Sequence, residues 1–325
     1  MAELNLVQAI NQGLAQAMEA DDKVVLLGED VGLNGGVFRV TEGLQKRFGP
    51  ERVLDTPLAE LGIVGASVGM AVYGLRPVCE IQFEGFLPAV MDQVICHMGR
   101  LRNRSRGRHT VPMVIRAPHG GLVHAPEHHS ESPESYFMHT PGIKVVAPAT
   151  PKDAKGLIIA AIKDPDPVIY FEPKRIYRAL KEDVPDQPYE VPIGKARVAK
   201  EGKDVTLISW GAMVHTCLEA AKKLSVEGVE AEVIDLRTIA PLDLEAILSS
   251  VAKTGRAVIA QESPKTCSVA SEISALIHER ALLKLQAPVK RVSGWDARMP
   301  LFRLEKYYVP DADRVVRGVK ETLQF

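Results

Sequence analysis

The residues best suited to acid–base chemistry are histidines concentrated in one stretch. Five of the nine histidines of this 325-residue chain lie there, at His119, His124, His128, His129 and His139. The unperturbed pKa of imidazole is near neutrality, so histidine can move protons at working pH. The centre of the stretch, PEHHSES (126–132), is rich in residues that favour a loop. The stretch predicts either a proton-handling site or a solvated loop, and the cluster alone favours the solvated loop.

A metal site is a second interpretation of these histidines. His124 and His128 have the spacing of two ligands on one helical turn. Gly120, Gly121 and Pro126 argue against a helix there. The chain has four cysteines, Cys79, Cys96, Cys217 and Cys267. They are too scattered to complete a zinc site and are typical of reduced thiols inside a cell. Zinc binding is kept only as an alternative.

Glu60 is the most notable carboxylate. The segment DTPLAELG (55–62) joins a predicted strand to a predicted helix, and ligands collect at strand carboxyl ends in open α/β sheets. The helix carries Gly62, Gly65 and Gly69, and each helical glycine costs about 1 kcal/mol relative to alanine. Close approach of another backbone would explain them. Glu60 is then either a partly desolvated functional carboxylate or a residue that stabilises the helix dipole, and the residues alone do not decide.

Other segments with polar residues also follow predicted strands. GEDVG (28–32) has neither the ending of a P-loop nor the spacing of a dinucleotide fingerprint. EIQFEGF (80–86) combines acidic and aromatic side chains at a strand end, and DPDP (164–167) is typical of a rigid turn. Taken alone, each segment is consistent with an ordinary turn or strand end.

The elements that must position these residues alternate between strands and helices. Strands are predicted at 24–27, 53–56, 77–83, 111–116, 144–147 and 168–171, and helices at 4–20, 60–73, 88–104 and 151–163. After a proline-rich passage, strands are predicted at 205–210, 231–236, 256–260 and 289–292, and helices at 214–226, 242–251 and 268–285. The prediction is an α/β protein with two domains of mostly parallel sheet, residues 1–185 and 204–325, joined by a linker at 186–203.

The bulk properties narrow the class of protein. Hydrophobic residues make up 46% and charged residues 25% of the chain, with a formal net charge of −1. This balance is typical of an ordinary globular protein and shows no basic excess for nucleic acid. The longest apolar run, residues 61–75, is too short to span a membrane. We therefore expect a cytoplasmic protein with neither nucleic-acid nor membrane partners.

Several ordered motifs together resemble one family. They are GEDVG…GGVFRVTEGL (28–44), DTPLAELGIVGASVGMA (55–71), RPVCEIQF (76–83), HHSES (128–132), PGIKVVAPATPKDAKGL (141–157) and EVIDLRT…P (232–241). They resemble the beta subunits of the thiamine-diphosphate-dependent 2-oxo acid dehydrogenases, over essentially the whole chain. The resemblance implies a transketolase-like fold, with a pyrimidine-binding domain followed by a transketolase C-terminal domain.

The resemblance also implies roles for cofactor-binding residues. Glu60 matches the carboxylate that hydrogen-bonds the pyrimidine ring nitrogen of thiamine diphosphate and thereby helps remove the thiazolium C2 proton. Glu29 matches a second acid near the pyrimidine. Leu58, Gln82 and Phe86 match positions that line the cofactor, with Phe86 packed on the pyrimidine ring.

The histidine stretch and a possible cation site have family counterparts as well. His129 matches the family's catalytic histidine, which handles protons as the acyl group passes to a lipoyl disulfide, and His128 is its substrate-side neighbour. In some members a structural potassium ion is held mostly by backbone oxygens. The corresponding positions are Met113, Ala161, Asp164 and Asp166.

What the chain lacks indicates its partners. It has no Gly-Asp-Gly motif for the diphosphate and Mg²⁺, so the resemblance implies that a separate alpha subunit holds them, in an alpha2-beta2 heterotetramer. The second implied partner is a lipoyl-bearing dihydrolipoyl acyltransferase. The expected reaction is oxidative decarboxylation of pyruvate with reductive acetylation of the lipoyl group. Branched-chain 2-oxo acid and acetoin dehydrogenases are alternatives, and a non-catalytic scaffold is the alternative from another class.

Overall fold

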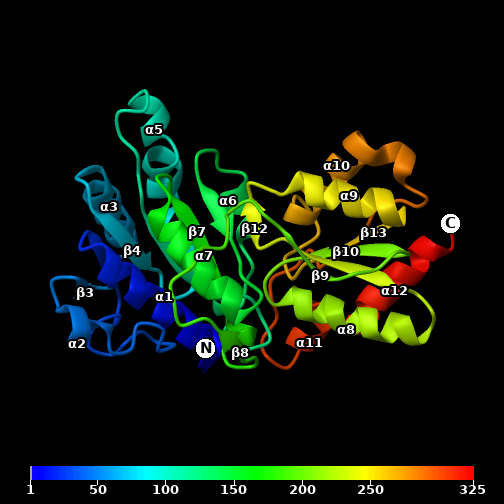
Figure 1. Cartoon of the computed structure of the whole chain (residues 1–325), viewed down its shortest axis with the longest axis horizontal. Helices are drawn as coiled ribbons and strands as arrows, with labels where there is room; N and C mark the ends of the chain where they lie inside the picture. Colours follow the sequence, from blue (N-terminus) through cyan, green and yellow to red (C-terminus); the bar gives the residue numbers. More distant parts are fainter. Residues whose placement is uncertain (1) are drawn as a thin grey trace. The chain divides into compact units, whose positions relative to one another are not determined.

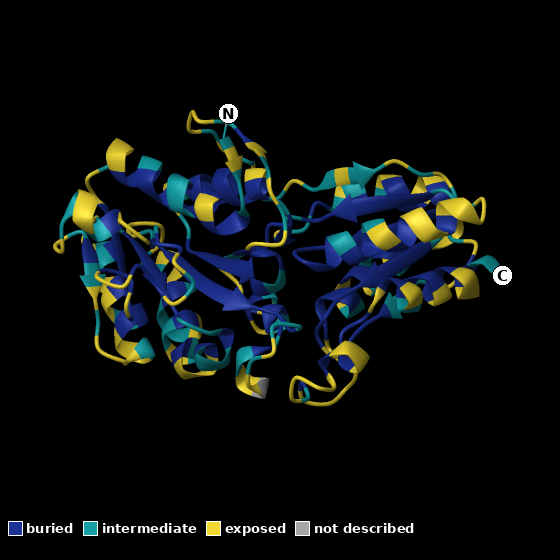
Figure 2. Ribbon diagram, turned by 90° about the horizontal axis from the view of Figure 1, so that it is seen from below, coloured by how far each residue is buried: buried dark blue, intermediate teal, exposed yellow. Residues whose placement is uncertain are grey.

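The structure is a computed structural model that describes residues 2–325. The chain forms two compact units. The first comprises Met1–His119 and Tyr136–Ile193, and the second comprises Gly120–Ser135 and Gly194–Phe325. Residues Gly120–Ser135, which carry His124, His128 and His129, therefore belong to the second unit. The range predicted for the first domain, 1–185, includes them. Figure 2 shows the same organisation in each unit, with buried strands beneath helices whose outer faces are exposed.

A parallel sheet forms the centre of the first unit. Its strands are β2 (Val24–Gly28), β3 (Val53–Asp55), β4 (Arg76–Glu80), β5 (Val114–His119), β6 (Lys144–Val146) and β7 (Val168–Pro173). They lie in the order β6-β7-β5-β4-β2-β3, and each neighbouring pair is parallel. Every residue of β2, β5 and β7 is buried. Burial on both faces explains why these strands are largely apolar, with the charged residues Arg116 in β5 and Glu172 in β7 as exceptions.

Helices cover both faces of this sheet. The principal ones are α1 (Leu6–Ala20), α3 (Glu60–Val72) and α7 (Pro151–Lys163). The β3-α3-β4 and β6-α7-β7 crossovers run in opposite directions along the sheet, so the right-handed rule places α3 and α7 on opposite faces. Helix α1 packs against α7 (Figure 1). Gly13 permits this close packing, because a Cβ there would lie 2.5 Å from Ile158 Cγ2.

Smaller elements complete the first unit. They are β1 (Ala2–Leu4), α2 (Leu44–Phe48), α6 (Glu134–Met138), which extends into it, and β8 (Glu182–Val184), which pairs with β1. The region predicted to be helical over 88–104 is helical apart from a turn at 99–100. The region contains a 3₁₀ turn η1 (Glu84–Phe86), α4 (Leu87–Asp92), a π-helix η2 (Gln93–Met98) and α5 (Leu101–Arg104). The break falls at Gly99, where a Cβ would lie 2.7 Å from the Pro141 carbonyl oxygen.

The second unit is a smaller α/β sandwich. Its sheet contains β9 (Arg197–Lys200), β10 (Val205–Ser209), β11 (Ala231–Asp235), β13 (Ala257–Ala260) and β14 (Lys290–Val292), in the order β14-β13-β10-β11-β9. Strand β9 is antiparallel to β11, and the other pairs are parallel. In Figure 1, α9 (Leu244–Thr254) and α10 (Val269–Ala281) cover one face, and α8 (Met213–Val226) and α12 (Ala312–Leu323) cover the other. Among the remaining elements are β12 (Thr238–Ala240) and α11 (Glu305–Tyr308).

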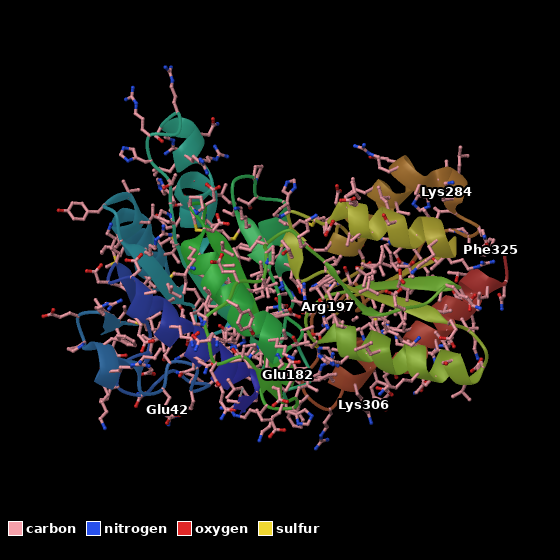
Figure 3. All side chains as sticks on the ribbon, viewed as in Figure 1. Glu42, Glu182, Arg197, Lys284, Lys306 and Phe325 are labelled. Atoms are coloured by element: carbon pink, nitrogen blue, oxygen red, sulfur yellow. The ribbon has the colours of Figure 1, made fainter. Side chains whose placement is uncertain are left out.

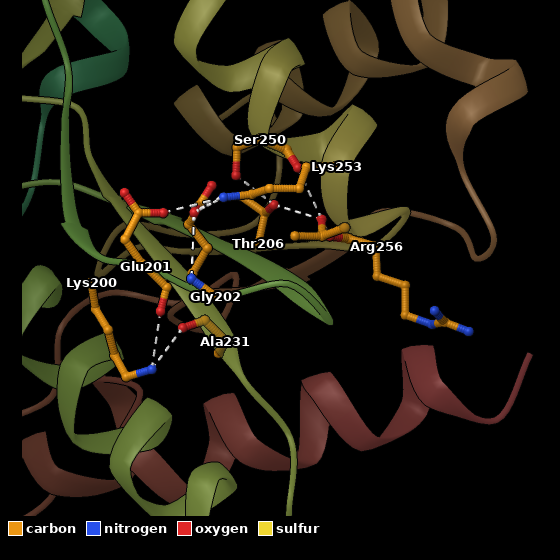
Figure 4. A network of polar contacts seen from close by, with 10 residues as sticks. Lys200, Glu201, Gly202, Thr206, Ala231, Ser250, Lys253 and Arg256 are labelled. Atoms are coloured by element: carbon orange, nitrogen blue, oxygen red, sulfur yellow. Dashed lines mark hydrogen bonds and ion pairs between the residues drawn. The ribbon is translucent and has the colours of Figure 1, made fainter.

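Strand β9 lies inside the range predicted as a linker. Its Arg197, labelled in Figure 3, donates a hydrogen bond to Asp235 Oδ2 at 3.0 Å. Figure 4 shows Gly202 and Lys253 beside the connection to β10. Glu232 accepts from the Gly202 N–H at 3.4 Å and also contacts Lys253. The pairing of β9 with β11 makes residues 197–200 part of the second sheet. Among residues 2–325, no helix combines the length and apolar character needed to cross a bilayer.

Candidate active site

Three of the predicted site segments meet at one edge of the first sheet. Glu29 directly follows β2, Glu60 begins the helix that follows β3, and Gln82 follows β4. Strand β2 lies between β3 and β4, and all three are parallel. Their carboxyl ends therefore lie side by side, which is where open α/β sheets bind ligands.

Glu29 is a buried carboxylate with an unused acceptor. Its side chain is 8% exposed, and its Oε1 atom has no hydrogen-bond partner among the described residues. Burial raises the pKa of Glu29, and the negative charges of Glu60, Asp30 and Glu80 raise it further. Glu29 and Glu60 are thus close enough to interact electrostatically. These neighbouring negative charges favour the protonated form of Glu29.

Glu60 is the first residue of α3. A capping box would need a Glu at the third helical position, but the N-cap is Ala59 and no side chain caps this end. The carboxylate therefore has the favourable electrostatics of a helix N-terminus without a capping role. The predicted backbone approach to the helix glycines is not found within the described residues. A Cβ at Gly65 would meet only the Gln93 side chain, and one at Gly69 would meet nothing within 4 Å.

Apolar and aromatic side chains accompany these carboxylates. Leu58 is 77% exposed in the segment before α3. Phe86, in η1, is half-buried, and its ring packs edge-on against Phe83 with a centroid distance of 6.4 Å. Phe83 in turn packs against Phe38 at 5.5 Å. Accessible apolar groups beside a few convergent carboxylates are typical of a site for an organic ring.

A buried ion network that the sequence analysis missed fixes the ends of β4, β5 and β7. Arg116 is 1% exposed and contacts Glu80 Oε2 and Glu172 Oε1, each at 2.7 Å. The Tyr177 hydroxyl donates to Glu172 Oε2 at 2.6 Å. Burial raises the pKa of Glu172, while Arg116 opposes the rise. The signal in the sequence was a charged residue inside each of two otherwise apolar strands. Glu80 belongs to this network, and its negative charge also raises the pKa of Glu29. The network therefore influences the electrostatics of Glu29 at the site.

The five histidines of the sequence cluster are divided between the two units. His119 ends β5 in the first unit, where its buried ring packs on Phe171 with a centroid distance of 5.0 Å. Burial, with a smaller effect from Lys174, lowers the pKa of His119 to about 3, so this imidazole is neutral. His139 is exposed in the first unit. Across the described part of the chain, no three His, Cys, Asp or Glu residues form a group that could hold a metal ion, so the zinc alternative has no ligand set there.

His128 and His129 lie in a 3₁₀ turn, η3 (Glu127–His129), of the second unit. Their rings meet edge-to-face with a centroid distance of 4.1 Å, and the His129 N–H donates to the Pro126 carbonyl at 2.9 Å. His128 is exposed and His129 is half-buried. A pair of adjacent imidazoles with access to solvent can exchange protons with a substrate.

The predicted cation positions contain paired carboxylates. Asp164 contacts Lys144 Nζ at 2.6 Å, and Asp166 contacts Arg102 Nη1 at 2.5 Å. Met113 is buried, and its carbonyl accepts the Val168 N–H at 3.0 Å. Because both carboxylates already have cationic partners, a bound cation would depend mainly on backbone oxygens.

The fold and the edge site define a transketolase-like protein. Residues 2–179 match the family model for the transketolase pyrimidine binding domain, and residues 194–315 match the transketolase C-terminal domain. A solved structure described as "Split gene transketolase, inactive beta4 tetramer" has the same fold. Its TM-score is 0.80 at 23% identity, with 99% of each chain covered. The predicted fold class is confirmed.

Full-length relatives define the family more narrowly. The pyruvate dehydrogenase E1 component subunit beta of Acholeplasma laidlawii is 51% identical over 321 residues, covering 99% of this chain and 98% of that protein. The corresponding Bacillus subtilis (strain 168) protein is 49% identical over 325 residues, the full length of both. The chain belongs to the family of pyruvate dehydrogenase E1 component beta subunits, and the family predicted from its motifs is confirmed.

Proposed function

We propose that this chain, together with an alpha subunit, catalyses the thiamine-diphosphate-dependent oxidative decarboxylation of pyruvate and the reductive acetylation of a lipoyl group. The observation that carries the proposal is the Glu29–Glu60 pair at the carboxyl edge of the first sheet. This pair occurs in a chain that matches named pyruvate dehydrogenase E1 beta subunits over its full length.

The residues at this edge fit a pyrimidine. The Glu60 carboxylate is free of any capping role and would hold a proton at the pyrimidine ring nitrogen. The Glu29 Oε1 atom, which has no hydrogen-bond partner within residues 2–325, offers a second acceptor in a carboxyl group whose pKa is raised. Leu58, Gln82 and Phe86 would line the ring. Thiamine diphosphate, when bound, supplies the carbanion chemistry needed to decarboxylate a 2-oxo acid.

We assign the later proton transfers to the histidine turn. His129 would donate and accept protons as the acyl group passes to the lipoyl disulfide, and His128 would contribute on the substrate side. Their proximity to one another and their access to solvent support this assignment.

The partners and ions are part of the same proposal. The absence of a Gly-Asp-Gly motif supports an alpha subunit that holds Mg²⁺ and the diphosphate in an alpha2-beta2 assembly, which works in the cytoplasm with a lipoyl-bearing dihydrolipoyl acyltransferase. Potassium would bind through backbone oxygens near Met113, Ala161, Asp164 and Asp166. If so, replacing K⁺ with Na⁺ lowers the thermal midpoint of the complex. An unchanged midpoint would remove potassium from the account.

The test of function uses the chain co-purified with its alpha partner, Mg²⁺ and thiamine diphosphate. Reduction of an artificial electron acceptor is followed on pyruvate, 3-methyl-2-oxobutanoate and acetoin in parallel. The proposal predicts strong turnover on pyruvate. A preference for the branched acid or for acetoin would keep the cofactor chemistry but change the substrate. No turnover on any of them, from a complex shown to contain the cofactor, would favour a non-catalytic scaffold.

A further inference from the structure

The loop that carries His128 and His129 is attached to its own unit through buried carboxylates. Residues Gly120–Ser135 belong to the second unit. In that unit Glu305 is fully buried, and its Oε2 accepts the His124 N–H at 3.4 Å. Glu305, which is distant in sequence, thus helps to hold the conformation of this loop.

Glu262 contacts both ends of the loop. It follows β13 and is 7% exposed. Its Oε2 accepts the Gly121 N–H at 3.0 Å and lies 3.5 Å from the Ser132 hydroxyl. The same ends are joined by a bond from the Gly120 N–H to the Glu131 carbonyl at 2.9 Å. A single carboxylate oxygen therefore contacts both ends of the loop, beside the backbone bond that also joins them.

The backbone of the loop is shaped around this carboxylate. Gly120 has a φ of +90°, and a Cβ there would lie 2.9 Å from Glu262 Oε2. Leu122 and His124 have φ values of 61° and 59°. These lie in the left-handed region of the backbone, which residues other than glycine rarely adopt. Such conformations persist only where the surrounding structure holds them, and they concentrate at functional sites. The loop is therefore a strained segment that depends on its anchors.

We propose that Glu262 is a positioning residue for His129, because its carboxylate fixes the loop conformation that presents the histidine turn. This inference rests on the function proposed above for His129. Glu262 acts through the loop rather than on the substrate. The role needs an acceptor oxygen at the position of Oε2, so glutamine can fill it, whereas alanine cannot.

The experiment compares variants in the alpha–beta complex with bound thiamine diphosphate and Mg²⁺. Glu262→Ala removes the anchor, and Glu262→Gln keeps an acceptor at the same reach. Thr254→Ala is the matched structural control, because Thr254 is 3% exposed in the same unit and bonds Thr206 Oγ1 at 2.7 Å. His129→Ala is measured alongside. Hydrogen exchange of the amides at 120–132 reports loop order independently of activity.

Two activities separate positioning from general stability. Pyruvate turnover with an artificial acceptor tests decarboxylation, and reduction of a free lipoyl domain tests the step assigned to His129. For Glu262→Ala we expect about tenfold faster exchange in the loop and a loss of about 10- to 100-fold in lipoyl reduction relative to decarboxylation. Glu262→Gln should restore both, and Thr254→Ala should leave the ratio of the two activities unchanged.

Each contrary result has a distinct meaning. Unchanged exchange in Glu262→Ala would overturn the anchoring role itself. Faster exchange with an unchanged activity ratio, while His129→Ala lowers that ratio, would overturn the positioning role and leave the proposed function intact. If His129→Ala itself leaves the ratio unchanged, the function assigned to His129 fails, and the inference fails with it.

Discussion

Replacing Arg116 with methionine should destabilise the first unit strongly. Methionine fills much of the arginine stem but leaves Glu80 and Glu172 without the guanidinium that lies 2.7 Å from each. Removing one partner of a buried ion pair costs about 3–5 kcal/mol. A typical domain is stable by only about 5–15 kcal/mol, so the expected loss is a large fraction of the total.

The loss should also depend on pH. Burial already raises the pKa of Glu172, and removing Arg116 takes away the charge that lowers it. The folded variant then retains a proton that the unfolded chain releases once the pH exceeds about 4.3. Because the folded state binds more protons there, the variant loses stability as pH rises through this window. The deficit relative to wild type should be larger at pH 7.5 than at pH 5.5.

Urea unfolding of the purified chain measures this effect. Both tryptophans, Trp210 and Trp295, lie in the second unit, so fluorescence follows that unit while circular dichroism follows both. The control is Lys163→Met, which breaks the exposed Lys163–Glu190 pair, also at 2.7 Å, and should change the free energy of unfolding by only about 0–1 kcal/mol. Equal effects of Arg116→Met and Lys163→Met, or a deficit that shrinks as pH rises, would refute the reasoning.

Two further predictions concern the second unit. His129→Ala should lower lipoyl reductive acylation by at least about 100-fold while affecting decarboxylation less, and equal loss of both half-reactions would contradict its assigned role. Burial raises the pKa of Glu134 to about 7 from its ordinary value near 4.5, although the Trp210 Nε1–H lowers it. The folded state therefore keeps this proton longer than the unfolded chain, and wild type loses stability as pH rises from 4.5 to 7. Glu134→Gln should flatten that part of the curve in urea titrations, and an unchanged slope would show that Glu134 is not its source.

The sequence predicted the strands at the site edge because local patterns determine them, while the roles of the site residues stay predictions. Apolar runs predicted β2, β3 and β4 to within a few residues, and parallel order then places Glu29, Glu60 and Gln82 at neighbouring strand ends. The helix α12 was missed although it has a local signal. Asp311 caps it, and its apolar residues recur at helical spacing from Ala312 to Val319.

The remaining errors involve contacts between residues distant in sequence. Glu262 lies 141 residues from Gly121, so no window of sequence relates the two. The turn at Gly99 lies against the Pro141 carbonyl, which is likewise remote in the chain, since a Cβ at Gly99 would lie 2.7 Å from that oxygen. The partners of a buried charge such as Arg116 depend on which strands pair in the folded sheet. The sequence indicated only that charged residues lie within otherwise apolar strands.

The most direct test of the central claim is Glu60→Gln in the alpha–beta complex with Mg²⁺ and thiamine diphosphate. Glutamine keeps the size of the side chain but has no carboxylate to share a proton with the pyrimidine ring nitrogen. The account predicts that the complex assembles and retains the cofactor while turnover on pyruvate falls by at least about 100-fold. Turnover near that of wild type in a complex with bound cofactor would contradict the account and remove Glu60 from the mechanism.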